Sequence, residues 1–412
     1  MFRPLLSFVL SFLAFGLSPV SGPAEAIKPA AQATTRNLFR DLLGKSEAEL
    51  DAKINAAWSH FFAGDKDTQR VYYPVGGDMA YIADIGNGDV RSEGISYGMM
   101  LAVQLDKQAE FDRLWKWAHT HMRHASGPRQ GYFAWQCKFD GTIIDPGSAS
   151  DGEEWIAMAL FFASHRWGNG TGIFNYGAEA QALLREMLHK PGTPEVTAII
   201  NHEALQVVFA PNRTIAGTFT DPSYHVPAFS ELWSRWADNA GDRRFWASVT
   251  DVSRSFFHRA AHPKTGLMPE YAYFDGRPHR AFVEDKGDFR YDAWRTLANV
   301  ALDHAWWNID PWQVEQSNRV LRFLQSQGPV IPNQFTLEGK PLSSSDSLGL
   351  TAMAAVAGQA ADAELARPFV QQLWDAPLPE GQWRYYNGML YFLGLLQAGG
   401  RFQVFEPAAA SK

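Results

Sequence analysis

The 412-residue sequence contains a single cysteine, Cys137. One thiol cannot form an intrachain disulfide, so the fold must be stabilised by burial, which is feasible for a chain of this length. Cys137 lies in WQCKF, a segment without the signature of a nucleophilic thiol. We therefore predict a buried structural cysteine and no cysteine chemistry.

Clusters of basic residues are also missing. The formal net charge is −7, and the lysines and arginines are scattered along the chain. Proteins that bind nucleic acids concentrate positive charge on one face or along one helix. Nucleic acid is therefore not expected as a partner.

Long apolar runs are absent except near the N-terminus. Arg3 is followed by LLSFVLSFLAFGL and by an A-x-A cleavage signal at 24–26, which predicts a secretory signal peptide over 1–26. A membrane anchor is the alternative, but the run is shorter than the roughly 20 apolar residues of a spanning helix. We expect a secreted or periplasmic protein that is free of the membrane after cleavage.

The remaining chain divides into a small-residue spacer over 27–35, one folded domain over 36–405 and a loose tail over 406–412. Within the domain, most segments between Gly, Pro and Asn residues show helical spacing of apolar residues. We predict thirteen helices. Their ranges are 35–43, 46–62, 96–104, 108–122, 153–167, 176–188, 227–237, 242–258, 291–306, 311–327, 348–360, 363–373 and 386–398.

Several predicted helices are apolar on more than one face, as in SYGMMLAVQL and IAMALFFASHRW. This pattern is typical of helices buried on both sides and predicts a double layer of helices. Strands alternating with helices are not predicted, apart from short β-like runs at 71–73 and 205–209. An α/β-hydrolase or dinucleotide-binding fold is therefore disfavoured.

The stretch RSEGISYGMM contains two candidate catalytic residues. Its GISYG matches the nucleophile elbow of serine hydrolases, with Ser96 as nucleophile. An elbow needs a strand running directly into the turn, whereas the preceding IADIGNGDVRSE reads as a loop. We favour a structural Ser96, whose flanking glycines allow close helix packing.

Glu93 precedes the same apolar run. Near a helix N-terminus, a lone acid is stabilised by the helix dipole, and its pKa is lowered. A general acid needs a raised pKa, which requires burial or other carboxylates close by. Asp151 and Asp292 also open largely apolar helices, so a ring of helices would bring all three acids to one rim.

Four segments carry a family resemblance. They are SEGISYGMMLAVQLDKQAEFDRLWKWA, ASDGEEWIAMALFFASHRWG, DPSYHVPAFSELWSRWA and FRYDAWRTLANVALDHAWW. In this order and spacing, the chain resembles glycoside hydrolase family 8 from about residue 71 to 306, and more weakly to 392. The resemblance implies an all-α (α/α)6 barrel and inverting hydrolysis of β-1,4-linked sugars.

The resemblance also implies roles for individual residues. Glu93 would be the general acid and Asp292 the general base. Asp151 would hold the distorted sugar and support protonation of the acid, Tyr224 would position the attacking water, and Arg295 would orient the base.

Two aromatic residues are implied to contact the sugar. Trp135 would be a stacking platform on the glycone side, and Tyr97 would be a further substrate-binding residue. The chain has 15 Trp, 13 Tyr and 28 Phe, and Trp and Tyr side chains stack well on the apolar faces of sugar rings.

The combination of SDGEE, HRWG and FRYDAWR resembles the xylan-active branch of the family, with xylan or xylo-oligosaccharides as substrate. This branch contains endo-xylanases and exo-enzymes that release xylose from the reducing end. In the exo type, a late loop that often carries a histidine recognises the reducing-end sugar. The corresponding segment, 339–350, has no histidine, so we expect endo action, with exo action as the alternative.

Three further hypotheses remain open: a β-1,4-glucanase of the same family, a carbohydrate-binding barrel without catalysis, and a serine esterase using Ser96. His119, His121 and His124 in HTHMRH have no Cys or acidic partner at ligand spacing. No metal or cofactor is therefore expected, and a monomer is expected.

Overall fold

The computed structural model describes residues 35–408. The predicted signal peptide (1–26), all of the predicted spacer except residue 35, and residues 409–412 of the predicted tail lie outside the described residues. The helices are α1 (Leu38–Leu43), α2 (Glu47–Trp58), α3 (Ser92–Gln104), α4 (Gln108–Trp117), α5 (Ser150–Trp167), α6 (Tyr176–His189), α7 (Pro227–Trp236), α8 (Ala240–Ala260), α9 (Arg295–Trp307), α10 (Trp312–Gln325), α11 (Leu348–Ala357), α12 (Ala363–Asp375) and α13 (Arg384–Ala398). The strands are β1 (Tyr72–Val75), β2 (Met79–Ile82), β3 (Val90–Arg91), β4 (Gln136–Cys137), β5 (Ile143–Asp145), β6 (Ile200–Asn201) and β7 (Gln206–Val207).

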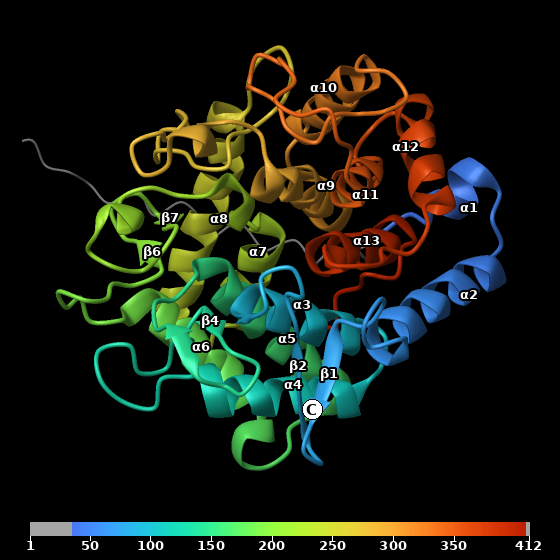
Figure 1. Cartoon of the computed structure of the whole chain (residues 1–412). Helices are drawn as coiled ribbons and strands as arrows, with labels where there is room; N and C mark the ends of the chain where they lie inside the picture. Colours follow the sequence, from blue (N-terminus) through green and yellow to red (C-terminus); the bar gives the residue numbers. More distant parts are fainter. Residues whose placement is uncertain (1–34, 409–412) are drawn as a thin grey trace, which may run out of the picture.

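Six helices form a closed inner ring, which Figure 1 shows around the middle of the molecule. Helix α3 packs against α5 and α13, and the contacts α7–α9, α9–α11 and α11–α13 continue the ring. Helices α5 and α7 meet through Trp155 and Phe229, whose ring centroids are 5.0 Å apart. The odd-numbered helices from α3 to α13 therefore enclose the core.

The even-numbered helices form an outer layer. Each packs against an inner helix: α2 on α13, α4 on α3, α6 on α5, α8 on α7, α10 on α9 and α12 on α11. Figure 1 shows these helices farther from the centre. The architecture is an (α/α)6 barrel, so the predicted all-α double layer is confirmed. Within residues 35–408, none of the helices combines the length and the apolar character needed to cross a bilayer.

All thirteen predicted helices are present, but the two that carry Glu93 and Asp151 begin earlier than expected. Helix α3 begins at residue 92 instead of 96, and α5 at residue 150 instead of 153. In both helices, the N-cap side chain makes no capping hydrogen bond. By contrast, Ser46 forms a complete capping box with Glu49 at the start of α2. The N-cap of α3 is Arg91 and that of α5 is Ala149, so neither start is capped in this way, although Ser150 and Glu153 have the spacing of a capping box.

The glycines around Ser96 serve close packing, as predicted. A Cβ atom added to Gly94 would lie 2.8 Å from the Tyr385 side chain, and one added to Gly98 would lie 2.7 Å from Ile82. Ser96 is buried inside α3, and its hydroxyl donates to the backbone oxygen of Glu93 at 2.7 Å. The segment before α3 is not entirely a loop, as we had expected, because the two-residue strand β3 pairs with β4.

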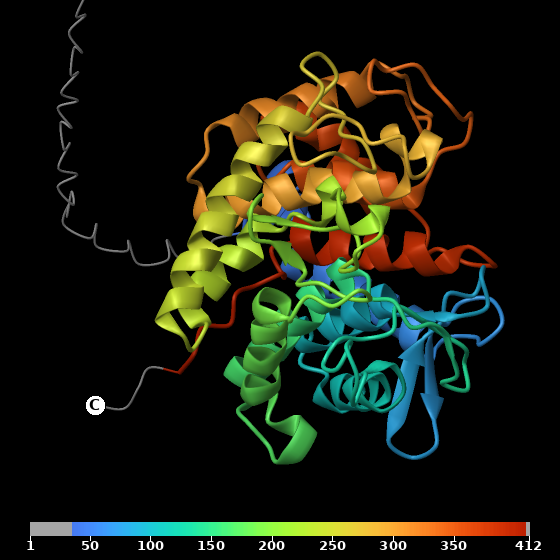
Figure 2. The same cartoon turned by 90° about the vertical axis from the view of Figure 1, so that its left-hand side faces the viewer.

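The strands form small antiparallel sheets at the edge of the barrel. Hairpin β1–β2 projects from its side in Figure 2. Sheet β3–β4–β5 lies next to the start of α3, and hairpin β6–β7 lies in the segment between α6 and α7. The β-like runs at 71–73 and 205–209 correspond to β1 and β7. These sheets leave the helical core intact and add loops around one end of the barrel.

Candidate active site

A cavity of about 1000 Å³ lies at one end of the barrel. The N-terminal end of every inner helix contributes to its wall. One lining residue from each is Glu93 (α3), Asp151 (α5), Tyr224 (before α7), Asp292 (before α9), Ser347 (before α11) and Tyr385 (α13). The ring therefore brings the three predicted acids to one rim, as expected from their positions at helix starts.

Glu93 lies in the first turn of α3 and is held by two partners. Its Oε2 atom is 3.1 Å from Nη1 of Arg295, and its Oε1 atom accepts a hydrogen bond of 2.9 Å from the Tyr385 hydroxyl. The pKa of Glu93 is raised to about 7, chiefly by burial; Arg295 opposes the shift, Asp151 and Asp292 add to it, and the Tyr385 hydrogen bond opposes it. Burial therefore outweighs the helix dipole, which by itself favours the ionised acid.

Asp151 lies in the first turn of α5 and is buried. Its Oδ2 atom accepts from Nη1 of Arg295 at 2.9 Å, and its Oδ1 atom accepts from the backbone N–H of Gly152 at 2.9 Å. A Cβ atom added to Gly152 would lie 2.4 Å from the Ser92 hydroxyl oxygen, so this glycine lets α5 approach the start of α3. Burial raises the pKa of Asp151, and Arg295 opposes that shift.

Asp292 belongs to the 3-10 turn η7 (Tyr291–Trp294), which leads into α9. Its Oδ1 atom is 3.2 Å from Nη2 of Arg295 and accepts a hydrogen bond of 3.4 Å from the Tyr386 hydroxyl. Of the three acids, Asp292 has the most exposed side chain, at 25% compared with 16% for Glu93 and 5% for Asp151. Asp292 is therefore the acid most open to water in the cavity.

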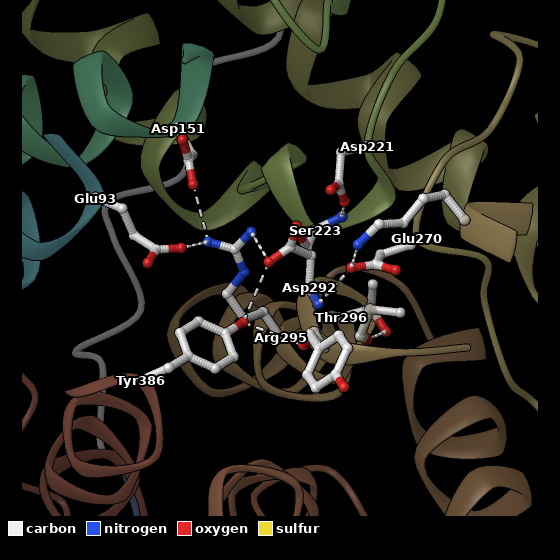
Figure 3. A network of polar contacts seen from close by, with 12 residues as sticks. Glu93, Asp151, Asp221, Ser223, Glu270, Asp292, Arg295, Thr296 and Tyr386 are labelled. Atoms are coloured by element: carbon white, nitrogen blue, oxygen red, sulfur yellow. Dashed lines mark hydrogen bonds and ion pairs between the residues drawn. The ribbon is translucent and has the colours of Figure 1, made fainter. Parts of the chain in front are cut away.

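One arginine links the three acids. Arg295 is buried and directs Nη1 to Glu93 and Asp151, and Nη2 to Asp292, as Figure 3 shows. The resemblance implied that Arg295 orients the base. In the structure, Arg295 contacts the other two acids as well. It is the first residue of α9, and its planar guanidinium has enough donors for several acceptors.

Two of the three predicted aromatic site residues line the cavity, and one does not. Trp135 is on the wall with the Arg91 guanidinium 5.6 Å from its ring centroid, and Tyr224 is on the wall beside Arg295. Tyr97 is completely buried outside the lining, and its hydroxyl accepts from Nη1 of Arg295 at 2.6 Å. The prediction that Tyr97 binds substrate is corrected: it lies one turn beyond Glu93 on α3 and supports Arg295.

Residue-based reasoning missed several polar groups of the site. Tyr385 and Tyr386 at the start of α13 bond to Glu93 and Asp292, while Glu270 and Lys286 lie on the cavity wall. The run WRYYNG at this helix start is an aromatic signal that could have indicated the two tyrosines. Glu270 and Lys286 lie in segments with no periodic pattern, so no local signal pointed to them.

The histidines of HTHMRH do not converge. His119 packs edge-on to Trp115, His121 packs against Trp117, and the His124 ring is 2.9 Å from the Pro146 carbonyl oxygen. Between residues 35 and 408, no group of three or more His, Cys, Asp or Glu side chains is arranged to hold a metal ion.

Comparison with known proteins gives results that agree with the family resemblance of the sequence motifs. The family described as Glycosyl hydrolases family 8 matches residues 82–400. The reducing-end xylose-releasing exo-oligoxylanase Rex8A of Paenibacillus barcinonensis is 46% identical over 377 residues, covering 90% of this chain and 97% of that protein. A reducing end xylose-releasing exo-oligoxylanase of Halalkalibacterium halodurans is 40% identical, covering 90% and 95%. A solved xylohexaose complex of a GH8 xylanase catalytic mutant from Teredinibacter turnerae superposes with a TM-score of 0.88 at 43% identity, covering 91% and 98%.

Proposed function

This chain belongs to glycosyl hydrolase family 8, and we propose that it releases xylose from the reducing end of xylo-oligosaccharides by inverting hydrolysis of β-1,4-xylosidic bonds. One observation supports this chemistry. Glu93 and Asp292 line the same cavity, and they contact different nitrogen atoms of the Arg295 guanidinium. Inversion needs two carboxyl groups on opposite sides of the sugar, one protonated and one ionised.

Glu93 is the proton donor to the departing sugar oxygen in this proposal. Its pKa of about 7, raised first by burial, keeps a proton on the side chain in weakly acidic solution. Tyr385 and Arg295 fix the two oxygens of the carboxyl group. A general acid works best when its pKa lies near the working pH, which this environment achieves.

Asp292 is the general base in this proposal. Its Oδ1 atom contacts Nη2 of Arg295 at 3.2 Å, and its partial exposure leaves room for a water molecule. The Tyr224 hydroxyl lies on the same wall, and burial raises the pKa of Tyr224 well above its usual value. Tyr224 therefore stays protonated and can donate a hydrogen bond to the attacking water.

Asp151 holds the sugar at the cleavage point in this proposal. It lines the cavity and shares Nη1 of Arg295 with Glu93, so its position is set by the same guanidinium. A carboxylate oxygen accepts hydrogen bonds from sugar hydroxyls, and such contacts strengthen as the ring distorts towards the transition state. Trp135 supplies an aromatic face on the cavity wall.

Release of xylose departs from our sequence-based expectation of endo action. The support for it is the 46% and 40% identity to relatives named exo-oligoxylanases, over nearly their full length. The loop that includes 339–350 contributes Asp346 and Ser347 to the cavity wall, so it is placed to contact the sugar despite lacking a histidine.

Endo action is the second candidate. Two observations favour it: the absence of a histidine from 339–350, and the TM-score of 0.88 with a protein named as a xylanase. The two modes differ in their first products, since exo action produces xylose and a chain one unit shorter, whereas endo action produces mixed short oligomers.

The test is to incubate the protein with xylohexaose, polymeric xylan and cello-oligosaccharides, and to follow product lengths and anomeric configuration. Xylose and xylopentaose as first products, with the inverted α-anomer, would support the proposal. Mixed oligomers would favour endo action. Turnover of cello-oligosaccharides but not of xylohexaose would identify a glucanase instead.

We also propose that the enzyme acts outside the cytoplasm, on the basis of the predicted signal peptide over 1–26. Expression of the full chain with fractionation of cells and medium tests this, since a cytoplasmic product of full length would contradict it. N-terminal sequencing of the exported protein would give the cleavage position.

A further inference from the structure

A second charged pair lies on the cavity wall beside Asp292. The ammonium nitrogen of Lys286 is 2.7 Å from Oε1 of Glu270. Glu270 is completely buried, whereas the Lys286 side chain keeps 25% of its surface exposed. Both residues line the cavity. An ion pair with one fully buried partner costs desolvation energy, so its retention at this position calls for an explanation.

The same Glu270 oxygen contacts the turn that carries the proposed base. Oε1 of Glu270 accepts a hydrogen bond of 3.4 Å from the backbone N–H of Asp292, shown in Figure 3. Turn η7 has no side-chain cap of its own. A carboxylate that accepts a free N–H at the start of a helical turn stabilises that turn, as an N-cap residue does. Glu270 therefore acts as a cap from a distant segment.

The pair is fixed by the backbone around it. The N–H of Glu270 donates to the Asp288 carbonyl oxygen at 2.9 Å, and the N–H of Tyr271 donates to the Lys286 carbonyl oxygen at 2.8 Å. These bonds tie the segment of Glu270 to the segment of Lys286 on both sides of the ion pair. The pair is therefore a fixed part of the cavity wall.

Lys286 adds a positive charge to a region around Asp292 that contains several acidic side chains. Titratable groups from several elements interact with the charge of Asp292, and two of those named here are cations. They are Glu93, Asp151, Asp221, Tyr224, Glu270, Tyr271, Lys286, Arg295 and Tyr386. Arg295 is already shared by Glu93, Asp151 and Asp292. Lys286 is the other cation of this group, and its ammonium nitrogen lies 2.7 Å from Glu270.

We infer that Glu270 and Lys286 form a positioning pair for the general base, in which Glu270 caps the turn that carries Asp292 and Lys286 holds Glu270 and places a positive charge beside the base. The inference rests on the proposed function, because it takes Asp292 as the base. Burial and the charge of Asp292 raise the pKa of Glu270 to about 7, and Lys286 opposes that shift. The charge on Glu270 near neutral pH therefore depends on its partner.

The test compares pH profiles of kcat/KM on xylotetraose for variants of the pair. Lys286→Met removes a positive charge near the base, so the acidic limb should move to higher pH by about one unit, and activity at pH values well below the limb should fall about tenfold. Lys286→Arg should keep the limb near its wild-type position. Glu270 already carries a proton across the acidic limb, because its pKa is about 7, so Glu270→Gln should leave the limb near its wild-type position. In the double variant Lys286→Met, Glu270→Gln, the limb should match that of Lys286→Met, because Lys286 is the member of the pair that is charged in this pH range.

Two exposed residues supply matched controls: Lys264→Met and Glu284→Gln should leave the profile unchanged. A rise in KM at constant kcat, with the acidic limb of Lys286→Met unmoved, would overturn the inference and make Lys286 a sugar-binding residue. A limb of Glu270→Gln that moves by about one unit would overturn it as well. If Lys286→Met does not fold, the double variant still tests the inference, because its limb must lie about one unit above that of the wild type. Absence of turnover by the wild-type enzyme would contradict the proposed function instead.

Discussion

At the scale of single residues, the main feature is how one arginine holds three acids in different states. Arg295 contacts Glu93, Asp151 and Asp292 at 3.1, 2.9 and 3.2 Å. A single positive charge cannot fully compensate three negative charges held this close together, so a proton must remain on part of the cluster. The pKa of about 7 for Glu93 indicates that this acid retains the proton.

The first prediction concerns this proton. Glu93→Gln keeps the shape of the side chain and its contacts to Arg295 and Tyr385 but cannot donate the proton. Removal of a general acid costs roughly 100- to 10,000-fold in rate, so kcat on xylotetraose should fall by at least about 100-fold with little change in KM. Steady-state kinetics measure this, and Glu364→Gln on the surface of α12 is the control. Activity within tenfold of the wild type would remove Glu93 from the proposed mechanism.

The second prediction concerns pH. Because Glu93 must be protonated, kcat should fall as pH rises through about 7. The Tyr385 hydroxyl donates to Glu93 and favours its ionised form, so it lowers the pKa of Glu93. Tyr385→Phe should therefore move the basic limb of the kcat profile to higher pH, by about half a unit. Tyr273→Phe, on the surface, should not move it, and a shift of the Tyr385→Phe limb to lower pH would contradict the assignment.

At the scale of elements, the start of α5 shows that burial can outweigh a helix dipole. Asp151, Glu153 and Glu154 all lie in its first turns, where the dipole favours ionised acids. Burial nevertheless raises the pKa of all three, that of Glu153 to about 8. Glu153 has one partner, the Phe133 N–H at 3.1 Å, which is too little to replace water around a full charge.

The third prediction follows from Glu153. In the unfolded chain this acid loses its proton above about pH 4.5, whereas in the folded chain it keeps the proton to about pH 8. The folded state therefore binds more protons between these values, and this group's contribution to stability is lost as pH rises towards 8. Glu153→Gln removes that loss while it retains the bond from Phe133. The melting temperature of the variant relative to wild type should rise by several degrees between pH 5 and pH 9, as scanning calorimetry can measure.

Glu364→Gln serves as the reference in these scans, because an exposed acid adds no pH-dependent difference of this kind. An equal effect of Glu153→Gln at pH 5 and pH 9 would show that Glu153 is ionised in the folded protein at both values.

At the scale of the whole molecule, the C-terminal segment closes the end of the barrel away from the cavity. Phe402 is completely buried and stacks on Trp306 at the C-terminal end of α9, with ring centroids 5.8 Å apart. Gln403 exchanges two hydrogen bonds of 2.9 Å with the side chain of Gln104 at the end of α3. The segment therefore connects inner helices from opposite halves of the sequence and completes the core.

The fourth prediction tests this closure. Phe402→Ala should leave a cavity in the core and lower the free energy of unfolding by about 3 to 5 kcal/mol. Activity at low temperature should be retained, since the active-site cavity lies at the other end. Phe139→Ala, on the surface at 39% exposure, should cost about 1 kcal/mol or less. Urea unfolding curves measure both, and equal midpoints for the two variants would contradict a closing role for Phe402.

The sequence by itself determined what depends on neighbours along the chain. Helical spacing of apolar residues predicted all thirteen helices, because side-chain period is a local property. The positions of Glu93, Asp151 and Asp292 at helix starts predicted their convergence, since parallel inner helices place their N-terminal ends on one rim. Motif order predicted the family and, through it, the barrel.

Only the tertiary structure decided which groups surround those acids. Closure of the ring brings Tyr385 onto Glu93 across 292 residues and Arg295 onto Glu93 across 202, and no pattern within a segment encodes such a pair. It also places Tyr97 outside the cavity wall and Glu270 beneath the turn of Asp292. The raised pKa of Glu93 follows from burial first and from these neighbours second, and burial exists only once the helices have packed into a ring.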